Sequence, residues 1–153
     1  MKQNFHWLQA SLVCGLLCLA AGCGNSDVGL VTGTIQLDGE PLEGAVITFY
    51  PVVEGSGRAN SGGASYGRTD AEGKYELVYN RSENGAEIGK HKVVITTLEE
   101  GGGDYGPGTP EKLPKRYNLE TELTAEVKSG RNTIDFLDLT SEGEKQKARA
   151  DTY

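Results

Sequence analysis

The sequence is poor in the side chains that most enzymes use to bind metals or to move protons. It has only two histidines and three cysteines, and His6 lies close to the N-terminus. A zinc site needs about four His, Cys or acidic ligands in a compact set, and a catalytic centre needs a nucleophile with a base, a pair of acids or a metal. We therefore predict no catalytic residue, no bound metal and no cofactor, and we expect His91 to fill a packing site. A lone general base at His91 is the weaker alternative.

Basic side chains are also outnumbered. The chain has 15 Lys and Arg against 22 Asp and Glu, which gives a net charge of -7. Such a surface repels a phosphate backbone, and no basic stripe runs along the sequence. The small cluster of Lys112, Lys115 and Arg116 is of a kind common on solvated loops. We expect no nucleic-acid partner.

No apolar run is long enough to cross a membrane. Residues 8–21 carry no charge and follow Lys2, but a spanning helix needs roughly 20 apolar residues. Small residues, Ala20-Ala21-Gly22, close the run immediately before Cys23. A basic start, a short apolar core and small residues at the end are typical of a secretory signal peptide.

The residues before Cys23 resemble the lipobox of bacterial lipoproteins. The match has one departure, because Ala20 stands three residues before the cysteine where leucine is usual, and Leu19 stands four before it. The resemblance implies cleavage before Cys23 and lipid on its sulfur and its new amine. Two or three acyl chains, at about 0.8 kcal/mol per buried methylene, give stable anchoring to a membrane. Residues 1–22 are then the signal peptide, and the membrane is the one partner that the sequence predicts.

The cysteine count favours lipidation over a plain secretory signal with Ala-x-Ala-type cleavage, which is the alternative. Cys14 and Cys18 lie inside the segment that would be removed. Cys23 then has no partner for an internal disulfide. Gly24 follows it in place of the aspartate that resembles an inner-membrane retention signal, so we expect a lipid-anchored protein of the cell envelope, in the outer membrane rather than the inner.

After a short tether, residues 23–29, apolar residues alternate with polar ones in short runs. Val31, Gly33, Ile35 and Leu37 fall on one face of the first run, and a period of two predicts half-buried strands. Asp38-Gly39 is a strong hairpin signal. The predicted strands are residues 30–37, 45–50, 65–69, 74–79, 91–98, 122–127 and 133–139. Seven short strands without a helix predict an all-β fold, a seven-stranded antiparallel β-sandwich over residues 30–140, followed by a disordered tail, residues 141–153.

Several motifs resemble carboxypeptidase regulatory-like domains, which have the transthyretin-like (prealbumin-like) Greek-key sandwich. They are Val31-Thr32-Gly33-Thr34-Ile35, Asp38-Gly39 with Pro41-Leu42 and Gly44-Ala45, Thr69-Asp70-Ala71-Glu72-Gly73-Lys74-Tyr75-Glu76-Leu77, Gly89-Lys90-His91-Lys92-Val93, Pro114-Lys115-Arg116-Tyr117-Asn118, and Gly130 with Asn132 and Ile134-Asp135-Phe136. His91 stands where the family usually has an aromatic. The resemblance covers about residues 30–140 and extends to small lipoproteins of planctomycete-type bacteria. It implies the fold and no ligand.

Two functions remain open for the sandwich. The first is a non-catalytic structural or protein–protein interaction role in the envelope, and the alternative is a carbohydrate- or peptide-binding module at the cell surface. A sugar platform uses exposed aromatics, and Trp7 is the only tryptophan. The weak binding candidates are Tyr66, Tyr105 and Tyr117, together with Tyr50.

Two further features leave alternatives open. Residues 99–120 are irregular and contain Gly101-Gly102-Gly103, and a loop of this length in a compact domain is either functional or disordered. The turns at Asp38 and Asp70 place carboxylates on tight bends, as calcium cages do. Turn preference alone explains both residues, so we predict no metal there.

Overall fold

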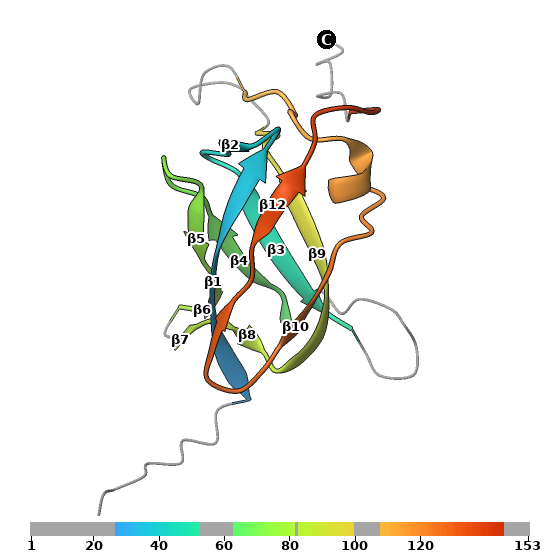
Figure 1. Ribbon diagram of the computed structural model, residues 1–153. Helices are drawn as coiled ribbons and strands as arrows, with labels where there is room; N and C mark the ends of the chain where they lie inside the picture. Colours follow the sequence, from blue (N-terminus) through green and yellow to red (C-terminus); the bar gives the residue numbers. More distant parts are fainter. Residues whose placement is uncertain (1–26, 53–62, 82, 100–107, 146–153) are drawn as a thin grey trace, which may run out of the picture.

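The computed structural model of the chain describes residues 27–52, 63–81, 83–99 and 108–145. Over this part the protein is all-β, and two sheets pack face to face around one core (Figure 1). The described residues form no α-helix, and one short 3-10 helix, η3 (Lys115–Tyr117), lies beside the second sheet. The prediction of an all-β, two-layered fold is confirmed.

The first sheet is built around one long strand. That strand is β1 (Val28–Leu37), and it pairs antiparallel with three short strands and parallel with two others. The antiparallel partners are β2 (Glu40–Pro41), β5 (Lys74–Glu76) and β8 (Ala86–Glu87), and the parallel partners are β11 (Arg131–Thr133) and β12 (Phe136–Leu139). Strand β1 therefore organises this whole layer, from the point where the tether would join it.

The second sheet is antiparallel throughout. Its order is β10 (Thr124–Val127), β9 (Gly89–Thr96), β3 (Val46–Pro51), β4 (Ser65–Arg68), β6 (Val78–Asn80) and β7 (Glu83–Asn84). The pairing of β3 with β9 is the longest, and it runs from Val46 opposite Thr96 to Pro51 opposite His91. The β-branched run that the sequence predicted as a strand thus lies near the middle of this layer.

Alternation along the strands supplies the core. Val31, Gly33 and Ile35 are buried in β1, while the intervening Thr32 is exposed, as the period of two requires. The buried apolar residues are Val31, Ile35, Leu42, Ala45, Ile47, Phe49, Tyr75, Leu77, Ala86, Val93, Ile95, Leu113, Tyr117, Val127 and Leu139. They come from both sheets and from the segment around η3, so the irregular segment before β10 also contributes side chains to the core.

The predicted strand at residues 74–79 divides into two strands that belong to different sheets. Strand β5 pairs with β1 in the first sheet, whereas β6 pairs with β4 in the second. Leu77 is the residue between them, and it is fully buried with its amide donating to the carbonyl of Val31. The chain therefore passes from the first sheet to the second at this buried residue. The segment that follows β6 contributes the short strands β7 and β8.

The predicted strand at residues 133–139 also divides, but both pieces stay beside β1. Gly130, with φ +88, reverses the chain after β10, a backbone conformation that costs glycine little. Strands β11 and β12 consequently run in the same direction as β1, with a register shift along β12. This parallel pairing is a difference from the wholly antiparallel sandwich that the short turns predict.

Part of the irregular segment and part of the expected tail belong to the packed structure. Glu99 and Thr109 form an isolated β-bridge, and residues 108–120 lie against the sandwich. Pro114 bridges to Lys145, and the amide of Lys115 donates to the carbonyl of Glu144. Residues 100–107 and 146–153 lie outside the described residues.

Candidate functional site

The outer face of the first sheet carries a shallow, open groove. Most of its lining side chains on β1 and β5 alternate with the core positions and point away from the core, while the buried Gly33 and Tyr75 form its floor and Arg68 of β4 lies at its edge. The groove is lined by Thr32, Gly33, Thr34, Arg68, Asp70, Lys74, Tyr75, Glu76, Thr133 and Asp135. Thr32 lies opposite Glu76 on β5 and opposite Thr133 on β11, and Thr34 lies opposite Lys74. We call this set of residues the groove face.

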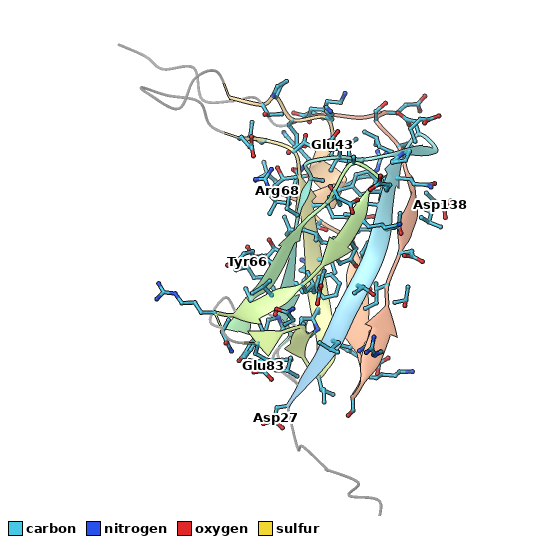
Figure 2. All side chains as sticks on the ribbon, turned by 90° about the vertical axis from the view of Figure 1, so that its left-hand side faces the viewer. Asp27, Glu43, Tyr66, Arg68, Glu83 and Asp138 are labelled. Atoms are coloured by element: carbon cyan, nitrogen blue, oxygen red, sulfur yellow. The ribbon has the colours of Figure 1, made fainter. Side chains whose placement is uncertain are left out.

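Figure 2 looks onto this side of the molecule, with β4, β5 and β1 toward the viewer. Tyr66 and Arg68 project from β4, two residues apart on the same face of the strand. Tyr66 is 58% exposed, and Arg68 lines the groove. Tyr66 does not itself line the groove, and its exposed ring lies two residues along β4 from Arg68, which does.

Two carboxylates of the groove face are held by the backbone. Oδ1 of Asp135 accepts a 2.8 Å hydrogen bond from the amide of Thr34. Oδ1 of Asp70 accepts from the amides of Glu72 (3.0 Å) and Lys74 (2.8 Å), the pattern by which an aspartate stabilises its own turn. Both groups are fixed in position, which gives the groove a defined acidic wall.

An ion pair ties one end of the groove to the segment after β9. A nitrogen of the Arg68 guanidinium lies 2.7 Å from Oε1 of Glu99, and Thr109 donates to Oε2 of Glu99 at 3.1 Å. The hydrogen bond from Arg68, followed by that from Thr109, holds the pKa of Glu99 below its ordinary value. Arg68 also donates to the carbonyl of Gly44 at 3.0 Å. Its guanidinium is thus positioned, although solvent screens the pair.

The remaining polar groups of the groove are available to a ligand. Within the described part of the chain, the side chains of Lys74, Thr32 and Thr133 form no hydrogen bond or ion pair. Glu76 accepts one bond, from Asn84 at 2.9 Å. The groove therefore offers an ammonium, two hydroxyls and carboxylate oxygens together, which suits recognition of a polar ligand by hydrogen bonds.

His91 occupies a packing site. Its side chain is 1% exposed, its ring lies 5.6 Å from the ring of Phe49, and Nδ1 lies 3.1 Å from the carbonyl oxygen of Gly89. Burial lowers the pKa of His91, opposed by the bond to Gly89 and by the charge of Glu87. Nε2 of His91 and Oγ of Ser65 are both buried without a hydrogen-bond partner in the described residues, so they do not bond to each other. A serine–histidine catalytic pair is not assembled here.

A buried carboxylate holds the segment after residue 107 onto β9. Glu111 is 7% exposed and accepts hydrogen bonds from Thr96 Oγ1, the Thr97 amide and the Leu113 amide, at 2.5 Å, 3.0 Å and 3.0 Å. Burial raises the pKa of Glu111, but these bonds, with one from the Thr97 hydroxyl (2.9 Å), lower it by more, so its pKa lies below the ordinary value. Glu111 stays ionised at neutral pH and has a structural role.

The tyrosines predicted as weak binding candidates lie in different surroundings. Tyr117 is 9% exposed, accepts a 3.2 Å bond from the amide of Thr140 on its hydroxyl, and lies under Arg116 at 4.8 Å from the ring. It anchors η3 instead of offering a surface. Tyr50 is half-buried, and Tyr105 lies outside the described residues. Tyr66 is the exposed one, and Cys23, the predicted lipid site, also lies outside the described residues.

The aspartate turns considered for calcium serve the backbone. Hydrogen bonds from the side chain and the amide of Ser141 hold the pKa of Asp38 below its ordinary value, and Asp70 is occupied by its own turn. Nowhere in residues 27–52, 63–81, 83–99 and 108–145 do three or more His, Cys, Asp or Glu side chains form a group that could hold a metal ion.

Sequence reasoning missed the groove itself. Most of its members on β1 and β5 are the outward residues of strands whose inward residues the alternation identified, so each strand's exposed face was implied separately. The parallel pairing of β11 on the other side of β1 was not implied, because it depends on the reversal at Gly130. The usable signal was the cluster of polar residues at every second position of residues 32–34 and 74–76.

Comparison with known proteins assigns no function. No family model matches the chain, and no curated protein matches it. Across the part of the chain that the structure describes, no helix combines the length and the apolar character needed to cross a bilayer. The geometry of the groove face and the sequence must carry the functional argument.

Proposed function

We propose that the chain is a lipid-anchored protein of a bacterial cell envelope, whose β-sandwich binds another protein without catalysis through the groove face. The observation that carries the binding proposal is the convergence of Lys74, Glu76, Thr32 and Thr133 in one groove that ends at Arg68, two residues along β4 from the exposed Tyr66. Tyrosine and arginine are enriched in protein–protein interfaces, and the rim of such an interface is polar.

The sequence supports the anchor. Residues 8–21 and the small residues before Cys23 have the pattern of a lipoprotein signal, with cleavage before Cys23 and lipid on that residue. The first strand begins at Val28, so four residues would join the lipid to the central strand of the first sheet. A tether this short suits a domain that works close to the membrane surface, with the outer membrane as the proposed location.

For the fold, we favour the transthyretin-like arrangement of carboxypeptidase regulatory-like domains. The motifs that carry this resemblance fall on coherent elements: Asp38-Gly39 turns β1 into β2, and Asp70 to Gly73 turns β4 toward β5. His91 packs against Phe49, which suits a position where that family usually has an aromatic. The described residues form twelve strands where the sequence predicted seven, because two predicted strands divide and three two-residue strands are added, so the strand count of the family stays part of the proposal.

A glycan is the second candidate ligand for the same face. Tyr66 is 58% exposed and shares a face of β4 with Arg68, which lines the groove, and an exposed aromatic ring can stack against a sugar. One tyrosine is a small platform, so the protein partner is the first candidate.

Cross-linking in native membranes tests the binding proposal. We expect the wild-type chain to yield a reproducible cross-linked protein partner, and we expect the double variant Lys74→Ala/Glu76→Ala to lose it. The matched control is Lys92→Ala/Glu122→Ala, which removes the same charges from exposed positions outside the groove. Equal cross-linking by both double variants would contradict a role for the groove face. Binding to a glycan array that is lost in Tyr66→Ala would establish the second candidate instead.

A further inference from the structure

Three segments of the chain meet at the end of the sandwich where β1 begins. The amide of Ile88 donates a 2.8 Å hydrogen bond to the carbonyl of Asp27, and the amide of Leu30 donates a 2.8 Å bond to the carbonyl of Gly130. Val28 pairs with Glu87, and Val127 pairs with Gly89. We call residues 27–30, 87–90 and 126–131 the anchor end. Figure 1 shows these segments together at the end opposite the last described residues.

The anchor end exposes two large apolar side chains. Ile88 is 45% exposed and Leu30 is 40% exposed. Leu30 lies in β1 and Ile88 lies between β8 and β9, and the backbone amide of each donates a hydrogen bond at the start of β1, so the backbone at both positions is held in place. Ile88 lies directly beside the residue at which the described chain starts.

The anchor end carries basic side chains, whereas two turns at the opposite end carry none. The three basic residues of the anchor end, Lys90, Lys128 and Arg131, are equal in number to its acids, Asp27, Glu87 and Glu126, and Glu87 accepts a hydrogen bond from the hydroxyl of Tyr79. The turns at the opposite end, residues 38–43 and 70–73, carry only acids: Asp38, Glu40, Glu43, Asp70 and Glu72. All five are exposed. Figure 2 shows Asp27 and Glu43 at opposite ends.

Tether length determines which end a membrane can reach. Five residue steps separate Cys23 from Val28, and an extended chain covers at most about 3.6 Å per residue, or about 18 Å in all. A lipid on Cys23 therefore keeps the start of β1 within about 18 Å of the lipid headgroups. Ile88 and Leu30 are the exposed large apolar residues nearest to that point, and the acidic turns lie at the far end of the sandwich.

From these observations we infer that the anchor end is a membrane-contact surface. Ile88 and Leu30 enter the headgroup layer of the bilayer, and Lys90, Lys128 and Arg131 contact anionic headgroups. The inference rests on the proposed lipid anchor, and it adds the orientation of the sandwich. The start of β1 lies at the membrane, the strand runs away from it, and the acidic turns lie at the end farthest from the lipid. Partly inserted apolar side chains and nearby basic groups are the two contributions that hold a domain at a lipid surface.

Tryptophan fluorescence on vesicles tests the inference, because cleavage before Cys23 removes Trp7 and leaves no other tryptophan. The full chain is expressed as wild type, Ile88→Trp and Glu43→Trp, and each lipidated protein is reconstituted into vesicles of phosphatidylcholine and phosphatidylglycerol with brominated acyl chains. We expect Ile88→Trp to lose most of its emission to the bromine and to shift to shorter wavelength. We expect Glu43→Trp to keep its emission, and the wild type provides the blank.

A second variant tests the charge contribution. Adding Lys128→Gln/Arg131→Gln to Ile88→Trp should weaken the quenching on these vesicles and leave it unchanged on vesicles of phosphatidylcholine alone. Vesicle flotation with no quenching at position 88, or with equal quenching at 88 and 43, overturns the inference and leaves the anchor intact. Failure to float, with no fatty acid on the wild type, overturns the anchor and the inference together.

Discussion

The hydroxyl of Tyr75 donates a 2.6 Å hydrogen bond to the carbonyl oxygen of Ile134, across the strand that separates them. Tyr75 pairs with Gly33 of β1, and the ring passes beneath this glycine to reach the far side of the strand. A Cβ on Gly33 would meet the carbonyl oxygen of Ile134 and lie 2.8 Å from Cε1 of Tyr75. The side chain of Tyr75 thus connects β5, β1 and the junction of β11 and β12 at the floor of the groove.

Tyr75→Phe should lower the free energy of unfolding by about 0.5–1.5 kcal/mol, because it removes one hydrogen bond to a partly buried carbonyl. Burial, with the nearby charge of Asp135, raises the pKa of Tyr75, so the phenol stays protonated and keeps donating at every ordinary pH. Urea unfolding at pH 7 measures the change. The control is Tyr66→Phe, since the hydroxyl of this exposed residue should contribute little. Equal stability of the two variants would contradict a structural role for this bond.

His91→Phe should make stability less dependent on pH between about 7.5 and 5.5. Burial lowers the pKa of His91 below its ordinary 6.5, so the unfolded chain takes up a proton at a higher pH than the folded protein. Stability of the wild type is therefore full above pH 6.5 and is lost as the pH falls below it. A phenylalanine fills the aromatic-type site against Phe49 and cannot titrate. Urea midpoints at the two pH values give the comparison, and an unchanged pH dependence in the variant would show that His91 is not the group responsible.

Glu111→Gln should destabilise the protein at neutral pH by about 1.5–3 kcal/mol, the range for hydrogen bonds to a charged group. The pKa of Glu111 lies below its ordinary 4.5, so its contribution is present above pH 4.5 and is lost as the pH falls through the folded value. The difference between wild type and variant should therefore shrink in acid. Glu120→Gln is the matched control, because Glu120 is exposed. A difference that stays constant down to pH 3 would be inconsistent with an ionised Glu111.

The alternation of apolar and polar residues predicted the fold class, because it identifies the buried face of each strand from that strand's own sequence. Val31 and Ile35 alternate with threonines, and this was sufficient to place β1 in a half-buried sheet. The change of layer at Leu77 could not be predicted, because a buried leucine fits either sheet equally well. The parallel pairing of β11 and β12 depends on how the chain reverses at Gly130, which is a tertiary property.

The site was less predictable than the fold. Tyr66 and Tyr117 were both predicted as weak binding candidates. The structure exposes Tyr66, whereas Tyr117 is buried and packs at η3 beneath Arg116. The polar side chains of the groove face have no motif of their own, since lysine, glutamate and threonine occur on any solvated strand. Only their meeting from β1, β4, β5 and β11 distinguishes them.

Acylation of Cys23 is tested most directly by metabolic labelling with a fatty-acid probe, followed by detergent phase partitioning. The wild-type protein should carry the label and enter the detergent phase, because acyl chains on Cys23 dominate its partition. Cys23→Ser should carry no label and stay in the aqueous phase. An unlabelled wild-type protein in the aqueous phase would show that no lipid anchors this chain.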